Sequence, residues 1–167
     1  MKVYVYGHND SPAPVIERCV EELQRLGCRI VPTPAEADVA IAPLLQKKIS
    51  IDEVNLPRLG TLIFHPSLLP RHRGRDAIRW AYHLSDRYTG ITWFWANEGL
   101  DCGDICEQEV LALDKNKRPR VFYSEDVVPA AVRLLRYAVR DLKAGIVRRR
   151  PQNEEAATYE LPFSRGQ

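Results

Sequence analysis

The stretch "GTLIFHPSLLPRHRG", residues 60 to 74, joins an apolar run to a stiff, basic turn. The apolar run stops at His65, and Pro66 and Pro70 bracket the Ser-Leu-Leu that follows. Because proline fixes its own φ and restricts the residue before it, this turn has few conformations open to it. We therefore predict that His65 is held rigidly at the end of a buried strand, either for chemistry or only as a hydrogen-bonding group.

Outward from this stretch, apolar and β-branched runs alternate with segments of helical period. Strands are expected at residues 2 to 6, 28 to 31, 38 to 43, 60 to 66, 89 to 96 and 104 to 113, and helices at 14 to 26, 75 to 84 and 124 to 144. Such alternation is typical of an α/β fold, here a Rossmann-like, mainly parallel sheet with flanking helices. Open sheets of this kind bind ligands at the carboxyl ends of their strands, where His65 would lie.

Length and composition fit one domain and exclude several classes of protein. The 167 residues suffice for a single core, which we place at residues 1 to 150, with 151 to 167 as a carboxyl-terminal tail. The net charge of +2 gives no field for nucleic acid, and no apolar run reaches the length of a membrane span. Four cysteines without CxxC spacing predict reduced packing residues and no metal site. We expect a cytoplasmic protein.

A second polar loop follows the aromatic strand that ends near residue 96. The segment "WANEGLDCGD", residues 95 to 104, carries Glu98, Asp101 and Asp104 in a loop that also contains two glycines. If its strand lies beside the His65 strand, both loops open at the same edge, and a carboxylate can reach the imidazole. That carboxylate would fix the tautomer and raise the histidine pKa, which suits proton transfer at a carbonyl. A solvated turn is the alternative interpretation.

Together, HPSLLPRHRG and the later TGITWFWANEGLDCGD resemble the formyltransferase fold family that uses 10-formyltetrahydrofolate. The family pattern is Asn-x-His-x-Ser-Leu-Leu-Pro followed by a Leu-Asp-x-Gly-Asp loop, and the resemblance covers residues 38 to 113. It implies that His65 and Asp101 are the catalytic histidine and aspartate. The family's catalytic asparagine falls on Ile63. Within the family, the likeness is strongest to the hydrolase domain of 10-formyltetrahydrofolate dehydrogenase, which also has an aliphatic residue at the asparagine position. The sequence PQNEEAATYE at 151 to 160 resembles the same domain and extends the likeness beyond residue 113.

Ile63 changes the chemistry that the resemblance implies. An asparagine amide would donate to the oxyanion formed when the formyl carbon is attacked, and losing one such donor typically costs about 10²–10³ in rate. Isoleucine has no donor. The oxyanion would then depend on a protonated His65 and on backbone N–H groups, while Asp101 holds His65 or steers the attacking water.

The resemblance also implies a folate site, with the pterin between a loop at about residues 44 to 49 and the backbone of residues 95 to 101. The residues concerned are Leu44, Leu45, Lys47, Lys48, Ile49, Trp95, Ala96, Asn97, Glu98 and Gly99. Lys47 and Lys48 could equally form a solvated basic turn. The arginines Arg71, Arg73 and Arg75 are candidates for an anionic acceptor, for the folate tail or for surface charge.

Three functions remain open from the sequence. The first is hydrolysis of 10-formyltetrahydrofolate to formate and tetrahydrofolate, which Ile63 favours. The second is transfer of the formyl group to a small amine, and the third is folate binding without catalysis. The amino-terminal half is shorter than is usual for the family by about one strand and one helix, which predicts a reduced acceptor side. Small-molecule substrates are expected, without nucleic acid or membrane partners, and a homo-oligomer is left open.

Overall fold

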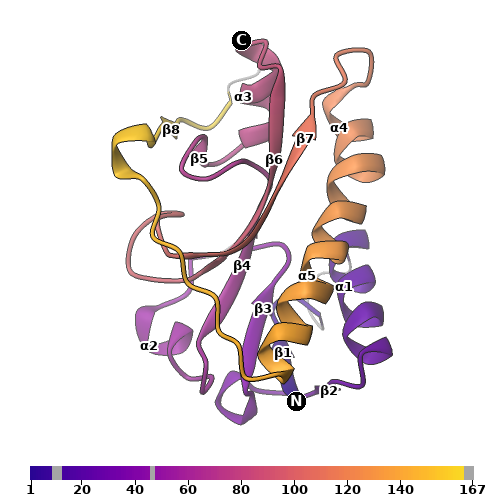
Figure 1. The fold of residues 1–167 in the computed structure, drawn as a ribbon, viewed down its shortest axis with the longest axis vertical. Helices are drawn as coiled ribbons and strands as arrows, with labels where there is room; N and C mark the ends of the chain where they lie inside the picture. The colour runs from indigo at the N-terminus through magenta and orange to yellow at the C-terminus, as the bar shows by residue number, and fades with distance from the viewer. Residues whose placement is uncertain (9–12, 46–47, 164–167) are drawn as a thin grey trace.

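The computed structural model describes residues 1–8, 13–45 and 48–163. Its main sheet has six strands in the order β2-β1-β3-β4-β6-β7 (Figure 1). These strands are β1 (Lys2–Val5), β2 (Arg29–Ile30), β3 (Val39–Ala42), β4 (Thr61–His65), β6 (Tyr88–Trp95) and β7 (Ile105–Ala112). The pairs β1·β2, β1·β3 and β3·β4 are parallel, whereas β6 is antiparallel to both β4 and β7. The expected mostly parallel α/β sheet is confirmed.

Two long helices, α1 (Pro14–Arg25) and α5 (Val128–Lys143), lie side by side and cover one face of the sheet (Figure 1). Between them, Glu22 is only 3% exposed and accepts a hydrogen bond of 2.6 Å from Nε of Arg136. The Arg136 guanidinium holds the pKa of Glu22 below its usual value, so this carboxylate stays charged although it is buried. One ion pair thus links the first helix to the last.

Short elements complete the chain. They are η1 (Pro34–Glu36), α2 (Ile51–Val54), β5 (Arg73–Gly74), α3 (Ala77–His83), α4 (Pro119–Phe122), the π-helical turn η2 (Tyr123–Val127), η3 (Glu154–Ala156) and β8 (Tyr159–Glu160). The helix predicted at 124 to 144 is therefore α5 with an irregular π turn before it. The one-turn helix α2 is capped by the Ser50 hydroxyl.

Side chains of β4 alternate between two environments because successive residues of a strand point to opposite faces. Leu62 and Phe64 belong to the main hydrophobic core, together with residues of α1 and α5. Ile63 packs instead with a smaller cluster that includes Ala40 and Ala42 of β3. His65, two residues after Ile63, shares this second face, so the long helices leave that face free for a site.

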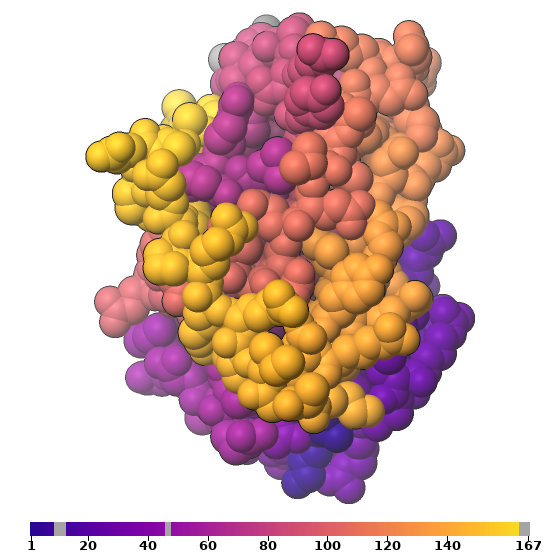
Figure 2. Space-filling view, in the orientation of Figure 1, coloured from indigo at the N-terminus to yellow at the C-terminus, as the bar shows by residue number. Residues whose placement is uncertain are grey.

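The segment expected as a tail packs against the domain as far as the structure describes it. Arg150 and Ile105 exchange two backbone hydrogen bonds of 2.8 and 3.0 Å. Farther on, β8 pairs in parallel with β5. Figure 2 shows this segment, in orange to yellow, lying over the surface of the domain. We call residues 150–160 the strap. The domain boundary at residue 150 itself stays a prediction.

Candidate active site

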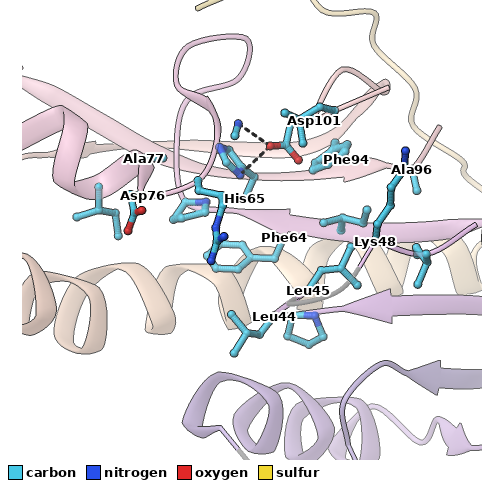
Figure 3. Close-up of a pocket in the computed structure, with 18 of the residues that line it drawn as sticks. Leu44, Leu45, Lys48, Phe64, His65, Asp76, Ala77, Phe94, Ala96 and Asp101 are labelled. Carbon is cyan, nitrogen blue, oxygen red and sulfur yellow. Dashed lines mark hydrogen bonds and ion pairs between the residues drawn. The ribbon is translucent and has the colours of Figure 1, made fainter. Parts of the chain in front are cut away.

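A cavity of about 1600 Å³ opens on the face of the sheet that carries Ile63 and His65 (Figure 3). Its walls come from residues 43–45 and 48–51, the end of β4, the chain from β5 into α3, the loop after β6 and the segment 118–123. The structure brings together here most of the residues singled out in the sequence: Leu44, Leu45, Lys48, Ile49, Ile63, His65, Ala96, Asn97, Glu98, Gly99 and Asp101.

Two of the predicted folate-site residues do not join this group. Trp95 is 1% exposed, and its indole N–H donates to the Arg148 carbonyl at 2.7 Å, with the Arg149 guanidinium 4.2 Å from the ring centroid. Its side chain therefore packs under residues 148–149, just before the strap, and does not line the cavity. Lys47 lies outside the described residues.

The tautomer of His65 follows from its hydrogen bond. The ring is 6% exposed, and Nε2 lies 2.7 Å from the backbone carbonyl oxygen of His72. A carbonyl oxygen can only accept, so Nε2 carries a hydrogen and the neutral ring keeps its free lone pair on Nδ1. The turn predicted to be stiff holds this arrangement, since the Ser67 hydroxyl donates to the Arg71 carbonyl at 2.6 Å within it.

Asp101 faces the free nitrogen of His65. Its Oδ2 lies 3.7 Å from Nδ1 of His65 and accepts a hydrogen bond of 2.8 Å from the Gly74 N–H, as the dashed lines in Figure 3 indicate. The Asp101 backbone has φ of 50°, in the left-handed region that aspartate tolerates better than most residues. Two hydrogen-bond acceptors, Oδ2 of Asp101 and Nδ1 of His65, thus lie close together at the cavity wall. A single water molecule can donate one hydrogen to each.

The route by which Asp101 reaches His65 differs from the one expected. Because β6 is antiparallel to β4, its carboxyl end pairs with the start of β4, Trp95 opposite Leu62, and not with the His65 end. The loop after β6 has to turn back along the sheet. Gly103 permits this turn, since an added Cβ would lie 1.7 Å from the Trp95 carbonyl oxygen. The prediction that both loops open at the same strand edge was wrong, although the two side chains do meet.

The direction of the His65 pKa shift was also predicted wrongly. Burial lowers the pKa of His65 below its ordinary value, and the nearby Asp101 carboxylate opposes this only in part. Desolvation dominates because almost no water reaches the ring, whereas Asp101 lies beyond direct hydrogen-bond distance. At neutral pH His65 is therefore an uncharged base.

Ile63 forms an apolar wall beside this pair. It is half-buried, lines the cavity two residues before His65, and packs in the cluster that contains Leu45 and Ile49. Its side chain offers no hydrogen-bond donor. An oxyanion formed in this part of the cavity would have to find its donors on the backbone, on protonated His65 or in water.

Of the three arginines considered in the sequence, one reaches the cavity. Arg71 pairs with Asp86 at 3.1 Å, and Arg73, fully buried, pairs with Glu154 at 2.6 Å. Arg75 lines the cavity. Sequence reasoning missed three further arginines in the cavity wall, Arg79, Arg118 and Arg120, because they stand in no motif and come from separate segments.

Metal and membrane features are absent from the described ranges 1–8, 13–45 and 48–163. No group of three or more His, Cys, Asp or Glu side chains there could hold a metal ion, and all four cysteines are free. No helix in the described part of the chain is both long and apolar enough to span a bilayer.

The family comparison agrees with the geometry. The family described as "Formyl transferase" matches residues 30–124. The chain is 40% identical over 124 residues to cytosolic 10-formyltetrahydrofolate dehydrogenase of Mus musculus. The matched region is 74% of this chain and 14% of the mouse protein. Its human counterpart is 37% identical over 158 residues, covering 95% of this chain and 16% of that protein. The chain therefore spans a small part of the length of these relatives.

Solved structures share the fold. HypX from Aquifex aeolicus superposes with a TM-score of 0.82 at 24% identity, covering 96% of this chain and 30% of that one. The formyltransferase PseJ from Anoxybacillus kamchatkensis gives 0.78 at 21% identity, covering 96% of this chain and 85% of that one. With a family match over more than half of its residues and these relatives, the chain belongs to the formyl transferase family.

Proposed function

We propose that the chain hydrolyses 10-formyltetrahydrofolate to formate and tetrahydrofolate. The observation that carries this proposal is the His65–Asp101 pair, two acceptors 3.7 Å apart at the cavity wall, with the donor-free side chain of Ile63 beside them. The relatives named as 10-formyltetrahydrofolate dehydrogenases support the substrate. So does the HypX structure described as a complex with tetrahydrofolic acid, which has a TM-score of 0.79 and 24% identity.

The reaction needs two proton transfers, and one base can perform both. Water attacks the formyl carbon and gives its proton to Nδ1 of neutral His65, forming a tetrahedral intermediate. When the bond between this carbon and N10 breaks, the imidazolium returns the proton to N10. The products are tetrahydrofolate and formic acid, which releases its proton to solvent and becomes formate. Asp101 orients the water at the start and stabilises the positive charge on His65 in between. No covalent intermediate with the protein is required.

We assign the folate ring to the apolar part of the cavity wall. Leu44, Leu45 and Ile49 supply apolar surface there, and the loop that contains Ala96 and Asn97 supplies backbone donors and acceptors. Small-molecule sites commonly combine apolar walls with a few placed polar groups in this way.

The direct test is a product balance. Purified protein is incubated with 10-formyltetrahydrofolate, with and without a panel of small amines, and formate, tetrahydrofolate and formylated amine are quantified. A hydrolase yields formate and tetrahydrofolate in equal amounts whether or not amines are added. Tetrahydrofolate that forms only with an amine would refute hydrolysis, and saturable binding without any product would leave a folate-binding protein.

The cavity volume favours a second candidate, transfer of the formyl group to a small amine. About 1600 Å³ exceeds the roughly 300–1,000 Å³ usual for one drug-sized ligand, so a second molecule would fit beside the folate. Arg75, Arg118 and Arg120 would give this part of the cavity an affinity for anionic groups. The PseJ structure, described with a formamido sugar nucleotide and tetrahydrofolate, is an example of such a two-substrate site.

Turnover should respond to pH as the protonation state of His65 requires. The base works when it is neutral, and burial lowers its pKa below the ordinary value of about 6.5. We therefore expect kcat/KM for formate release to be constant across neutral pH and to fall only below that value, as His65 becomes protonated. A pH–rate profile of kcat/KM measures this. A decrease of kcat/KM that already begins well above pH 7 as the pH is lowered would contradict the role of a buried, neutral His65 as the base.

Replacing Ile63 with asparagine should change both stability and the choice of acceptor. The asparagine amide would donate a hydrogen bond to the oxyanion and make this part of the cavity wall polar. The ratio of amine formylation to hydrolysis should therefore rise. An amide without partners among apolar neighbours should lower the free energy of unfolding by about 1–3 kcal/mol. The product balance above and thermal melting measure the two effects, with Ile63→Val as the apolar control. An unchanged ratio in a folded Ile63→Asn protein would show that Ile63 does not select the acceptor.

A further inference from the structure

The strap places one side chain between the two catalytic loops. Gln152 is 9% exposed, and its Nε2 donates to the backbone carbonyls of Asp101 at 2.9 Å and Gly103 at 2.7 Å. Its Oε1 accepts from Nε of Arg73 at 3.1 Å and from Nη2 of the same residue at 2.7 Å. Both donors and both acceptor positions of the amide are thus used, which is uncommon for a side chain that serves only solubility.

These contacts join two segments that lie far apart in the sequence. Arg73 belongs to β5, just after the histidine turn, whereas Asp101 and Gly103 belong to the loop after β6. Asn97 to Leu100 in that loop are exposed, so they bury little surface that could fix its position. Asp101 itself has the left-handed φ of 50° and is held by the Gly74 N–H at its carboxylate and by Gln152 at its carbonyl. Removing the Gln152 contacts would leave this residue anchored at one point.

The strap is well fixed and can therefore act as a support. The buried Arg73 guanidinium donates to both carboxylate oxygens of Glu154, at 2.8 and 2.6 Å, and to the Tyr159 hydroxyl at 2.5 Å. Burial of a charge is tolerated only when it is paired and hydrogen-bonded in this way. The strap also contacts the turn that holds His65, because the Thr158 hydroxyl accepts from the His72 N–H at 2.8 Å.

From this arrangement we infer that Gln152 is a positioning residue, which acts on formyl transfer by fixing Asp101 against His65 through the backbone of the aspartate loop. The inference rests on the proposed function of the His65–Asp101 pair and assigns to the strap a part in that site. Gln152 does not line the cavity and is not expected to touch substrate, so its loss should slow the chemical step and leave folate binding nearly unchanged.

Two substitutions separate this role from a general effect on folding. Gln152→Met keeps the length of the side chain and removes all four hydrogen bonds. Gln152→Glu keeps an acceptor for Arg73, which should hold the strap in place, but cannot donate to the two carbonyls. Glu155→Gln, an exposed position on the same strap, is the matched control. Thermal melting and circular dichroism establish which variants are folded.

We expect both Gln152 variants to lower kcat by about 10- to 100-fold, since misplacement of a catalytic group by about 1 Å costs up to about 10² in rate. KM for 10-formyltetrahydrofolate should change by less than about threefold, and Glu155→Gln should match the wild type. In an Asp101→Asn background, Gln152→Glu should cause little further loss, because both changes disable the same group. A folded Gln152→Glu protein with wild-type kcat would overturn the inference. So would a double variant in which the losses of kcat from Asp101→Asn and Gln152→Glu multiply in full.

A measurement without turnover keeps this inference separate from the proposed function. The Gly74 N–H is bonded to the Asp101 carboxylate, so its hydrogen exchange, followed by NMR, should quicken in Gln152→Glu and not in Glu155→Gln. Unchanged Gly74 exchange in the Gln152 variant would refute positioning of Asp101 even if the wild type is active. A wild-type protein that releases no formyl group would refute the proposed function, and Gly74 exchange would still decide the role of Gln152.

Discussion

Replacing His65 with alanine is expected to lower kcat for release of the formyl group from 10-formyltetrahydrofolate by about 10³-fold, within the range of about 10²–10⁴ typical for a general acid–base residue. His65 has a free Nδ1 at the cavity wall, and in the proposed reaction this nitrogen takes the proton from water and returns it to N10. Folate affinity should change little because the apolar wall formed by Leu44, Leu45 and Ile49 is intact. Steady-state kinetics and equilibrium titration with tetrahydrofolate measure the two quantities.

The matched control is His83→Ala, since His83 is an exposed histidine of α3 that does not line the cavity. It should retain wild-type kcat. If His65→Ala folded normally and kept more than about a tenth of the wild-type kcat, the reaction would not depend on proton transfer by His65. The assignment of His65 as the base would then be wrong.

The Asp101→Asn change should cost about 10²–10³ in kcat, with a near-normal Kd for folate. Asparagine has almost the same shape and can still accept from the Gly74 N–H, so the loop should keep its position. It has no negative charge to stabilise protonated His65. Kinetics of the variant at several pH values test this.

Asp104→Asn, three residues farther along the same loop, is the comparison for Asp101→Asn. Asp104 does not line the cavity, and we expect wild-type turnover from that variant. Equal losses from both substitutions would indicate that net charge of the loop matters and that Asp101 has no particular role.

The sequence predicted the elements of this site well because its local signals are strong. The run from Thr61 to His65 ends where proline enforces a turn, and the alternation of strands and helices correctly indicated a mostly parallel sheet. The direction of β6 could not be predicted in the same way. A strand has the same period of two residues in either direction, so only its pairing with β4 and β7 in the folded chain distinguishes the two.

The electrostatic prediction failed for a related reason. A carboxylate near His65 was visible in the sequence, but the burial of the ring to 6% exposure was not, and desolvation outweighs a carboxylate at 3.7 Å. The packing of the strap against the site was not predicted, because its contacts come from single polar side chains such as Gln152 and Glu154, which follow no periodic pattern. Polar contacts between residues so far apart in the sequence leave no local pattern.

Single-turnover hydrolysis in water enriched with oxygen-18 tests the central claim most directly. The protein, in excess, is mixed with 10-formyltetrahydrofolate and no amine, and the formate is analysed by mass spectrometry beside the same reaction of His65→Ala. Attack by water predicts formate with one oxygen-18 atom, released together with tetrahydrofolate by the wild type and about 10³-fold more slowly by the variant. Saturable folate binding without release of labelled formate, or equal rates for the two proteins, would contradict hydrolysis by the His65–Asp101 pair.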